Sequence, residues 1–233
     1  MATKKNADVV QIVPPKFKEV EITIRGLTPL MTNPFGNKAR ISLPDAPEVE
    51  KPKIKTKAHD PVIAYNTMMD SLYWLTEKPQ AGADEEEAEA IWESVKDSAA
   101  FGFPVTGIKQ SIITGAYRAG LDVKMTELRA SFWLRGGTEK GTQDLAEIVS
   151  APPVLRVDIG RNSGMTRSAK HCIRPEFAEW EIPLILKYIE NGRYTLDQLM
   201  NLVNYGGFAS GIGEWRPEKD GQHGMYELKI NFR

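Results

Sequence analysis

The chain has 233 residues, of which 41% are hydrophobic, and its 30 Lys and Arg residues against 31 Asp and Glu residues give a formal net charge of −1. This composition is typical of one large globular domain or two small ones, and it excludes a polycation, so a nucleic-acid site would have to be a local basic patch. The single cysteine, Cys172, excludes a disulfide framework and a thiolate metal cluster within one chain.

The sequence contains no sign of a membrane span, a signal peptide or a metal centre. No apolar run approaches the roughly 18 residues that a membrane helix needs, and the segment Met1–Asn6 lacks the apolar core of a signal peptide. The three histidines, His59, His171 and His223, do not have the spacing of zinc ligands. We therefore expect a cytoplasmic protein without membrane contact, metal or cofactor.

The N-terminal part predicts a tail, a strand and a long loop. Residues 1–18 are mostly polar, which predicts a flexible tail. Residues 19–25 alternate polar and apolar side chains, the period of a half-buried strand. Residues 36–60 contain many Pro and Lys residues without periodicity and predict a loop. Four lysines in it alternate, so an extended chain would present them on one face, where they could follow a phosphate backbone or merely be solvated: Lys51, Lys53, Lys55 and Lys57.

The middle of the chain predicts helices and then strands. Amphipathic spacing predicts helices over 61–76, 84–98 and 106–120. The second begins with a run of acids, which suits the positive end of a helix dipole. Residues 128–135 and 154–159 predict strands, and 160–176 predicts a loop or an extended hairpin.

The C-terminal part predicts a strand, a helix, a glycine-rich loop and a last strand. Residues 179–190 alternate strictly, although Pro183 indicates an edge position or a bulge. A helix is expected over 195–205, with Thr195 as its N-cap. The loop 206–224, with six glycines in nineteen residues, then leads to a strand over 225–232.

The elements outside the insertions follow the order β-α-β-β-α-β. This order predicts an α+β protein with a ferredoxin-like (RRM-like) core, in which both helices cover one face of the sheet. The expected organisation is a tail over 1–18 and one domain over 19–233, with insertions at about 36–100 and 138–176.

Two segments are candidates for contacts with a polyanion. The first, residues 156–174, has five bases and one acid and is expected to project as a loop. Alternatively, it is a solvated loop whose arginines pair with the acidic helix 84–98. The second is the glycine-rich loop, whose backbone N–H groups could hold phosphate while Trp215 stacks on a base and Arg216 contacts phosphate. Alternatively, its glycines only form a tight structural connection.

Several segments resemble parts of known families. The strand Val20–Ile24 followed by Gly26-Leu-Thr-Pro-Leu30, and the glycine-rich loop before the last strand, resemble segments of the RAMP superfamily, the RNA-binding subunits of CRISPR effector complexes. The patterns Arg174-Pro-Glu-Phe-x-x-Trp180 and Gly211-Ile-Gly-Glu-Trp-Arg-Pro217 are more similar to a group of uncharacterised bacteriophage proteins, over most of 18–232. The resemblance implies a single-stranded nucleic-acid ligand and self-assembly along it.

These observations favour a non-catalytic, phage-encoded protein that binds single-stranded RNA or DNA as a homo-oligomer in the host cytoplasm. RNA-processing members of the superfamily place a histidine in the N-terminal domain, where this chain offers only His59. The expected contacts are Arg156, Arg161, Arg167, Lys170, Arg174, Trp215, Arg216 and Lys219, with loop glycines Gly206, Gly207, Gly211 and Gly213. One alternative is a metal-independent endoribonuclease that uses His59, His171 or His223. The other is a protein–protein module that acts on a host complex.

Overall fold

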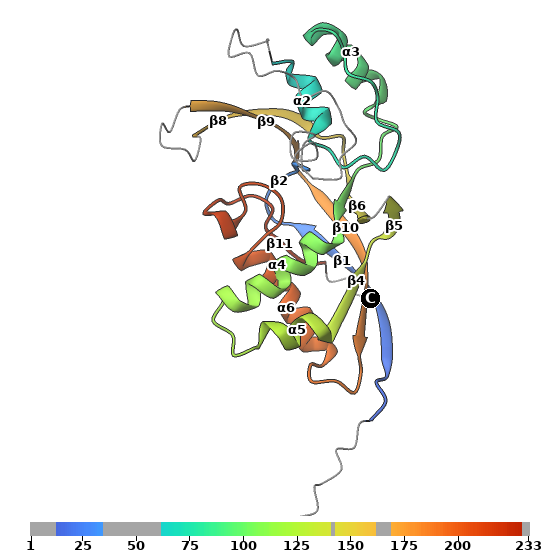
Figure 1. Cartoon of the computed structure of the whole chain (residues 1–233), viewed down its shortest axis with the longest axis vertical. Coiled ribbons are helices and arrows are strands. Elements are labelled where there is room, and N and C mark those ends of the chain that lie inside the picture. The colour runs from blue at the N-terminus through green and yellow to red at the C-terminus, as the bar shows by residue number, and fades with distance from the viewer. Residues whose placement is uncertain (1–12, 35–61, 141–142, 162–168, 230–233) are drawn as a thin grey trace, which may run out of the picture.

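The computed structural model describes residues 13–34, 62–140, 143–161 and 169–229 (Figure 1). Their architecture is mixed α+β with antiparallel sheets. The main sheet has the strand order β11-β1-β10-β4, with β7 (Val149–Ser150) paired to one end of β10. Its strands are β1 (Phe17–Gly26), β4 (Phe132–Arg135), β10 (Trp180–Ile189) and β11 (Tyr226–Leu228).

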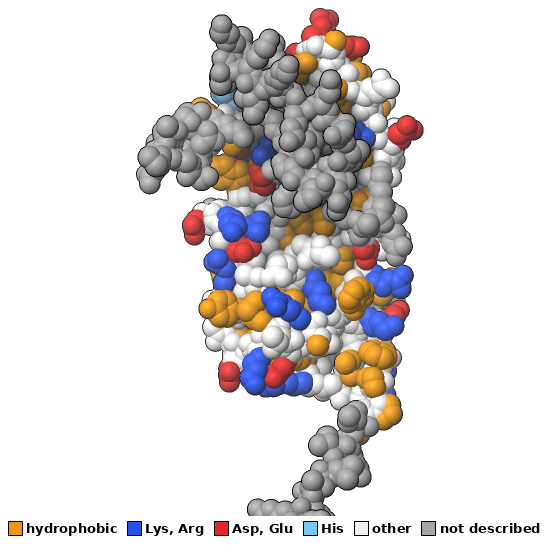
Figure 2. All heavy atoms as spheres, viewed as in Figure 1, with side chains coloured by type: hydrophobic (Ala, Val, Ile, Leu, Met, Phe, Trp, Pro, Cys, Tyr) orange, Lys and Arg blue, Asp and Glu red, His pale blue; other side chains and the backbone are white. Residues whose placement is uncertain are grey.

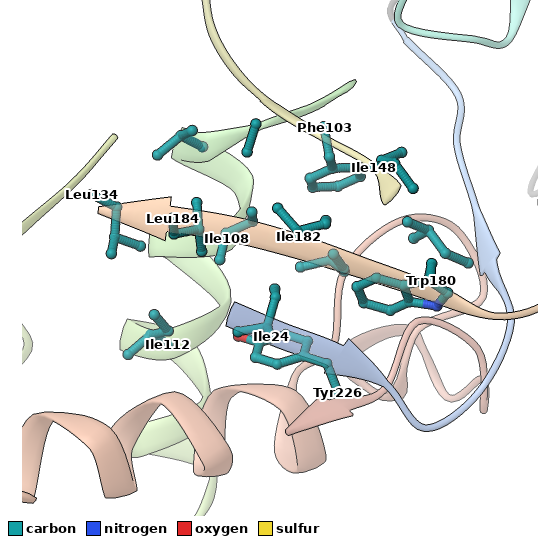
Figure 3. Close-up of a cluster of buried hydrophobic side chains, with 14 of the residues drawn as sticks. Ile24, Phe103, Ile108, Ile112, Leu134, Ile148, Trp180, Ile182, Leu184 and Tyr226 are labelled. Carbon is teal, nitrogen blue, oxygen red and sulfur yellow. The ribbon is translucent and has the colours of Figure 1, made fainter. Parts of the chain in front are cut away.

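One face of this sheet is covered by helices. These are α4 (Val105–Arg118), α5 (Met125–Ser131) and α6 (Leu196–Ala209), which lie on the same side of the strands in Figure 1. The strand residues that point to the helices are apolar, since alternate side chains of a strand point to opposite faces. Figure 3 shows Ile24 of β1 and Ile182 of β10 packed with Ile108 of α4, and all three are fully buried.

The opposite face of the main sheet carries the alternate strand residues, whose side chains point away from the helices. Glu21 and Arg25 of β1 and Pro183 of β10 are exposed there. Arg25 pairs with Glu227 of β11, and Lys229 pairs with Glu181 of β10 at 2.9 Å. This open face is therefore polar at the β11 edge and, as shown below, aromatic and basic near β4.

Two smaller antiparallel sheets complete the fold. The first has the order β2-β9-β8, with β2 (Leu30–Met31), β8 (Val154–Arg161) and β9 (Ala169–Phe177). Helix α2 (Ala64–Asp70) packs on it, and α3 (Glu85–Val95) packs on α2. The second has the order β3-β6-β5, with β3 (Gly102–Pro104), β5 (Gly137–Lys140) and β6 (Gln143–Glu147). A short 3₁₀ helix, η1, spans Pro217–Lys219.

Several boundaries differ from the sequence-based expectations. The expected strand 128–135 is a helix, α5, up to Ser131 and a strand only from Phe132. Its Leu128 and Phe132 fit a helical period as well as an alternating one, and Leu128 is fully buried as part of α5. The first expected helix is shorter, since α2 ends at Asp70. The last strand is described only over Tyr226–Leu228, and the predicted loop 36–60 lies outside the described residues.

Pro183 lies within a central strand, in a position that spares its missing N–H. Its partner in β1 is Thr23, whose carbonyl accepts a hydrogen bond from Lys229 at 2.8 Å. The polar backbone groups of Thr23 thus point toward β11, and the nitrogen of Pro183 points away from β1. On that side β4 pairs with residues 185–188 and β7 with residues 180–181, so Pro183 lies in the gap between them. The predicted edge position therefore holds only at Pro183 itself. β10 as a whole is not an edge strand, because it pairs with β1 on one side and with β4 and β7 on the other.

Candidate nucleic-acid interface

The described parts of the basic segment, residues 156–161 and 169–174, lie in the paired strands β8 and β9, which agrees with the extended alternative of the sequence-based prediction. Arg156 of β8 is held by two carboxylates: its Nε lies 2.7 Å from Asp158 Oδ2, and its Nη1 pairs with Glu176 of β9. Both hydrogen bonds favour the charged guanidinium and raise the pKa of Arg156. Its donors are thus largely engaged within the hairpin.

Arg174 joins the hairpin to the C-terminal loop. Its Nε donates to Glu214 Oε2 at 2.7 Å, its Nη1 donates to the Ile173 carbonyl at 2.7 Å, and only 16% of its side chain is exposed. Glu214 also accepts a hydrogen bond from Asn33. The two segments that were singled out from the sequence therefore touch each other through an ion pair.

For the two arginines of the segment whose side chains are described, Arg156 and Arg174, the carboxylate partners lie outside the acidic helix. In α3, Glu85 accepts from the backbone N–H of Ala64 at 2.6 Å, and Glu89 accepts from the Tyr65 hydroxyl at 3.0 Å. Asp84 caps the helix by accepting from the N–H of Glu87 at 2.9 Å. Figure 2 shows acidic side chains gathered over this end of the molecule.

In the C-terminal loop, Arg216 is also engaged within the chain. Its Nε lies 2.9 Å from Glu218 Oε2, and its Nη1 donates to the Gly213 carbonyl at 2.8 Å. Trp215 is 41% exposed and has a positive φ of 55°. Lys219, in η1, is exposed. Trp215 and Lys219 thus remain accessible to a ligand.

The glycines of this segment serve two different structural purposes. Gly206 and Gly207 lie in α6 and not in a loop, which corrects the prediction. A Cβ on Gly206 would lie 2.7 Å from Ile112 Cα, so its absence lets α6 approach α4 closely. Gly211 and Gly213 have φ values of 66° and 77°, which only glycine adopts freely, and they form the turn after the helix.

The remaining expected contacts are described less fully. Arg161 is the last residue of β8 and Lys170 the second residue of β9, and their side chains are not described. Arg167 lies outside the described residues, as do His59 and the lysines of the 36–60 segment. These positions remain predictions.

The described histidines do not assemble a catalytic group. His171 is exposed on β9, and His223 lies in the C-terminal loop, where its Nδ1 is buried without a hydrogen-bond partner. Within the described ranges, no group of three or more His, Cys, Asp or Glu residues could hold a metal ion. In the same ranges, no helix combines the length and apolarity that crossing a membrane requires.

A second basic surface, which the sequence did not single out, lies at the β4 end of the main sheet. A hollow of about 340 Å³ is lined by residues of β1, α4, α5, β4 and β10. We call its aromatic and basic members the Trp133 surface: Phe17, Lys109, Arg129, Trp133 and Lys187. Phe17 is 59% exposed and Trp133 is 60% exposed, although aromatic rings of this size are usually buried.

Strand register explains how these side chains come together. Trp133 of β4 is directly opposite Lys187 of β10, and both belong to the alternate set that points away from the helices. The ammonium of Lys187 lies 5.5 Å from the centre of the Phe17 ring. That of Lys109, which projects from α4 at the sheet edge, lies 5.1 Å from the Trp133 ring. Each cation therefore lies within cation–π distance of an exposed ring.

The Trp133 surface has few acids to neutralise its bases. Lys187 pairs with Glu19 at 3.1 Å. Lys109 donates to the Arg129 carbonyl at 3.0 Å, and among the described residues neither Lys109 nor Arg129 forms an ion pair. Partial burial without a carboxylate lowers the pKa of Lys109. A phosphate placed here would supply the missing negative charge.

A signal for this surface was present in the sequence. Phe132 and Trp133 are adjacent in a strand, so one ring must point to the core and the other must point away from it. Phe132 is buried and Trp133 is exposed. The position of Lys109 beside them depends on the packing of α4 and α5 and could not be read from the sequence.

Comparisons with known proteins add little to this description. No family model matches the sequence, and no curated protein matches it. Among solved structures, the chain is similar to one in the cryo-EM structure of the Type III-B Cmr-beta bound to cognate target RNA, with a TM-score of 0.36 and 10% sequence identity. The match covers 90% of this chain but only 59% of the other. A likeness this weak carries no argument about function.

Proposed function

We propose that this protein binds single-stranded nucleic acid without cleaving it, and that the Trp133 surface is its principal contact. The observation that carries the proposal is an exposed tryptophan flanked by lysines, one of which has no carboxylate partner among the described residues. Stacking of a base on an aromatic ring contributes about 1–3 kcal/mol, and lysines beside the ring would contact the phosphates.

Single strands suit this surface better than a duplex. The bases of a duplex are stacked on each other and present only their edges in the grooves, whereas unpaired bases can stack on a side chain. Phe17 and Trp133 line the same hollow with Lys187 between their strands. Two bases of one strand could therefore use the two rings, with the intervening phosphate near Lys187.

The hairpin and the C-terminal loop are proposed as a secondary contact. Trp215 and Lys219 are exposed, and the predicted contacts Arg161, Arg167 and Lys170 belong to the same basic segment of the sequence. Arg156, Arg174 and Arg216 would contribute less, because each already donates to a carboxylate. The phage origin and the assembly of several copies along the ligand remain inferences from the resemblance.

The proposal includes a ferredoxin-like core. What supports it is the order β11-β1-β10-β4, in which the first and third strands along the chain are central, together with α4 and α6 on one face. The open face of such a core is free for a ligand, and the Trp133 surface lies at the β4 end of that face. Fold alone does not determine function, so the proposal rests on the side chains.

The test is fluorescence anisotropy of labelled RNA and DNA single strands of about 16 nucleotides, and of the matching duplexes. We expect one or both single strands to bind more tightly than either duplex, and binding to weaken between about 50 and 200 mM salt. The RNA and DNA arms decide which ligand is preferred. Absence of binding to both single strands at the lower salt concentration would overturn the proposal.

A further inference from the structure

Strand β8 has one edge that no described strand pairs with, and it exposes three aliphatic side chains. It is the outer strand of the β2-β9-β8 sheet, and no described strand pairs with its other edge. Of its side chains, Val154 is 58% exposed, Val157 is 53% exposed and Ile159 is 74% exposed. Figure 1 shows the β8–β9 hairpin projecting from the body of the molecule below α2.

An edge of this kind is a template for another strand. The unpaired N–H and C=O groups of an edge strand can continue the sheet into a second chain, and soluble proteins usually block such edges with proline, charged side chains or a covering element. β8 contains no proline, and its charged residues Arg156 and Asp158 pair with each other at 2.7 Å. Its exposed Val and Ile residues instead favour strand pairing.

The order of side chains along β8 is complementary to itself. In an antiparallel pair of two β8 strands centred on Val157, each Arg156 lies opposite Asp158 of the other copy. Leu155 lies opposite Ile159 in the same register. Centring the pair on Arg156 or on Asp158 would place like charges opposite each other, which is destabilising. The Val157-centred register therefore places apolar side chains opposite apolar ones on one face and opposite charges together on the other face.

The two faces of the hairpin agree with this register. Val157 lies opposite Ile173 of β9, on the face where Ile173 is buried. Arg156 and Asp158 point to the other face, where they already pair at 2.7 Å. A twofold axis perpendicular to the sheet keeps each face on its own side, so it would extend the apolar layer and join the charge pairs of the two copies into one network of four residues.

We infer that two copies of this chain associate through β8, as an antiparallel pair centred on Val157. This symmetric dimer does not require nucleic acid and does not use the Trp133 surface. It therefore goes beyond the proposed function and differs from assembly along a ligand. In the dimer, the exposed side chains of Val157 and Ile159 would be covered by those of the other copy.

A cysteine placed on the axis tests the register. Two Val157→Cys residues would lie directly opposite each other, within the range of a disulfide. Val154→Cys is the matched control, because Val154 is equally exposed on the same strand but would lie about 20 Å from its symmetry mate. Both variants are made with Cys172→Ser and oxidised as dilute full-length protein without nucleic acid.

We expect the Val157→Cys chain to form a disulfide-linked dimer and the Val154→Cys chain to remain monomeric on non-reducing gels. Equal cross-linking of both variants, or of neither, would overturn the inference. Light scattering gives an independent readout of mass. One chain has a mass of 26.0 kDa, so the dimer should have twice this mass, and the Val157→Lys variant should have the mass of one chain. Retention of oligonucleotide binding by Val157→Lys separates this result from the proposed function, and an unchanged circular dichroism spectrum shows that the variant folds.

Discussion

Two surfaces of this molecule combine tryptophan with basic residues, and they differ in what surrounds the bases. On the hairpin and C-terminal loop, the three described guanidinium groups each contact a carboxylate, as in the pair of Arg174 and Glu214. At the Trp133 surface, Lys109 and Arg129 have no carboxylate partner among the described residues. The number of bases in a segment therefore says less about binding than whether those bases are already paired.

Whether a base is already paired with a carboxylate also decides whether it contributes to the stability of the fold or to ligand binding. A partly buried ion pair that joins two segments holds the fold together, and its removal leaves an unpaired charge. A cation beside an exposed ring contributes little to the fold and remains available to a ligand. We therefore expect substitutions in the first region to affect unfolding and substitutions in the second to affect affinity.

The largest expected effect is that of Trp133→Ala. Loss of one stacked base should weaken single-strand binding by about 5- to 150-fold, which corresponds to 1–3 kcal/mol. Because Trp133 is 60% exposed, thermal stability should change little. Trp215→Ala is the matched control, and anisotropy titrations of both variants make the comparison. A larger loss of affinity for Trp215→Ala would reverse the assignment of the two surfaces.

The next effect is that of Lys109→Gln, which removes one cation but keeps a polar side chain only one atom shorter. We expect the affinity to fall for all sequences and the slope of log K against log salt to decrease by about 0.7, the value for one contact with a single-stranded phosphate. Arg216→Gln serves as the control, since its guanidinium already contacts Glu218. An unchanged salt slope for Lys109→Gln would remove Lys109 from the interface.

A smaller effect should appear as a pH dependence. Burial lowers the pKa of Lys109, so its ammonium is present below that lowered pKa and is lost as the pH rises through it. Binding should therefore weaken with rising pH before ordinary lysines lose their charge. Affinities measured at constant ionic strength on the alkaline side of neutrality check this. The Lys109→Arg variant, which stays charged, should bind equally over the same range.

The smallest effect on binding is expected for Arg174→Ala, which should instead lower stability. Removing a hydrogen-bonded guanidinium leaves Glu214 without its cationic partner and should cost about 1.5–3 kcal/mol, measured by urea denaturation. Anisotropy should show a change in affinity of less than about twofold. Weaker binding with unchanged stability would show that Arg174 contacts the ligand and that its ion pair does not stabilise the fold.

Local patterns predicted most of the elements. The alternation over 179–190 predicted β10, and Thr195 does cap α6, with its hydroxyl accepting from the N–H of Gln198 at 3.3 Å. The errors occurred where two patterns overlap. Residues 128–135 satisfy an alternating and a helical period at once, and the packing of Leu128 in the core decided for the helix. Gly206 and Gly207 are poor helix formers, but α6 continues through them because only glycine fits against α4 and β11.

What the sequence by itself determined is therefore the set of amphipathic segments, because period and capping depend on neighbouring residues. The sequence also determined that Phe132 and Trp133 point to opposite faces. Only the tertiary structure decided which bases are neutralised, because Arg174 meets Glu214, forty residues away, while Lys109 meets Trp133 across a sheet edge. Charge pairing depends on distances in space, and these distances are set by the packing of the whole chain.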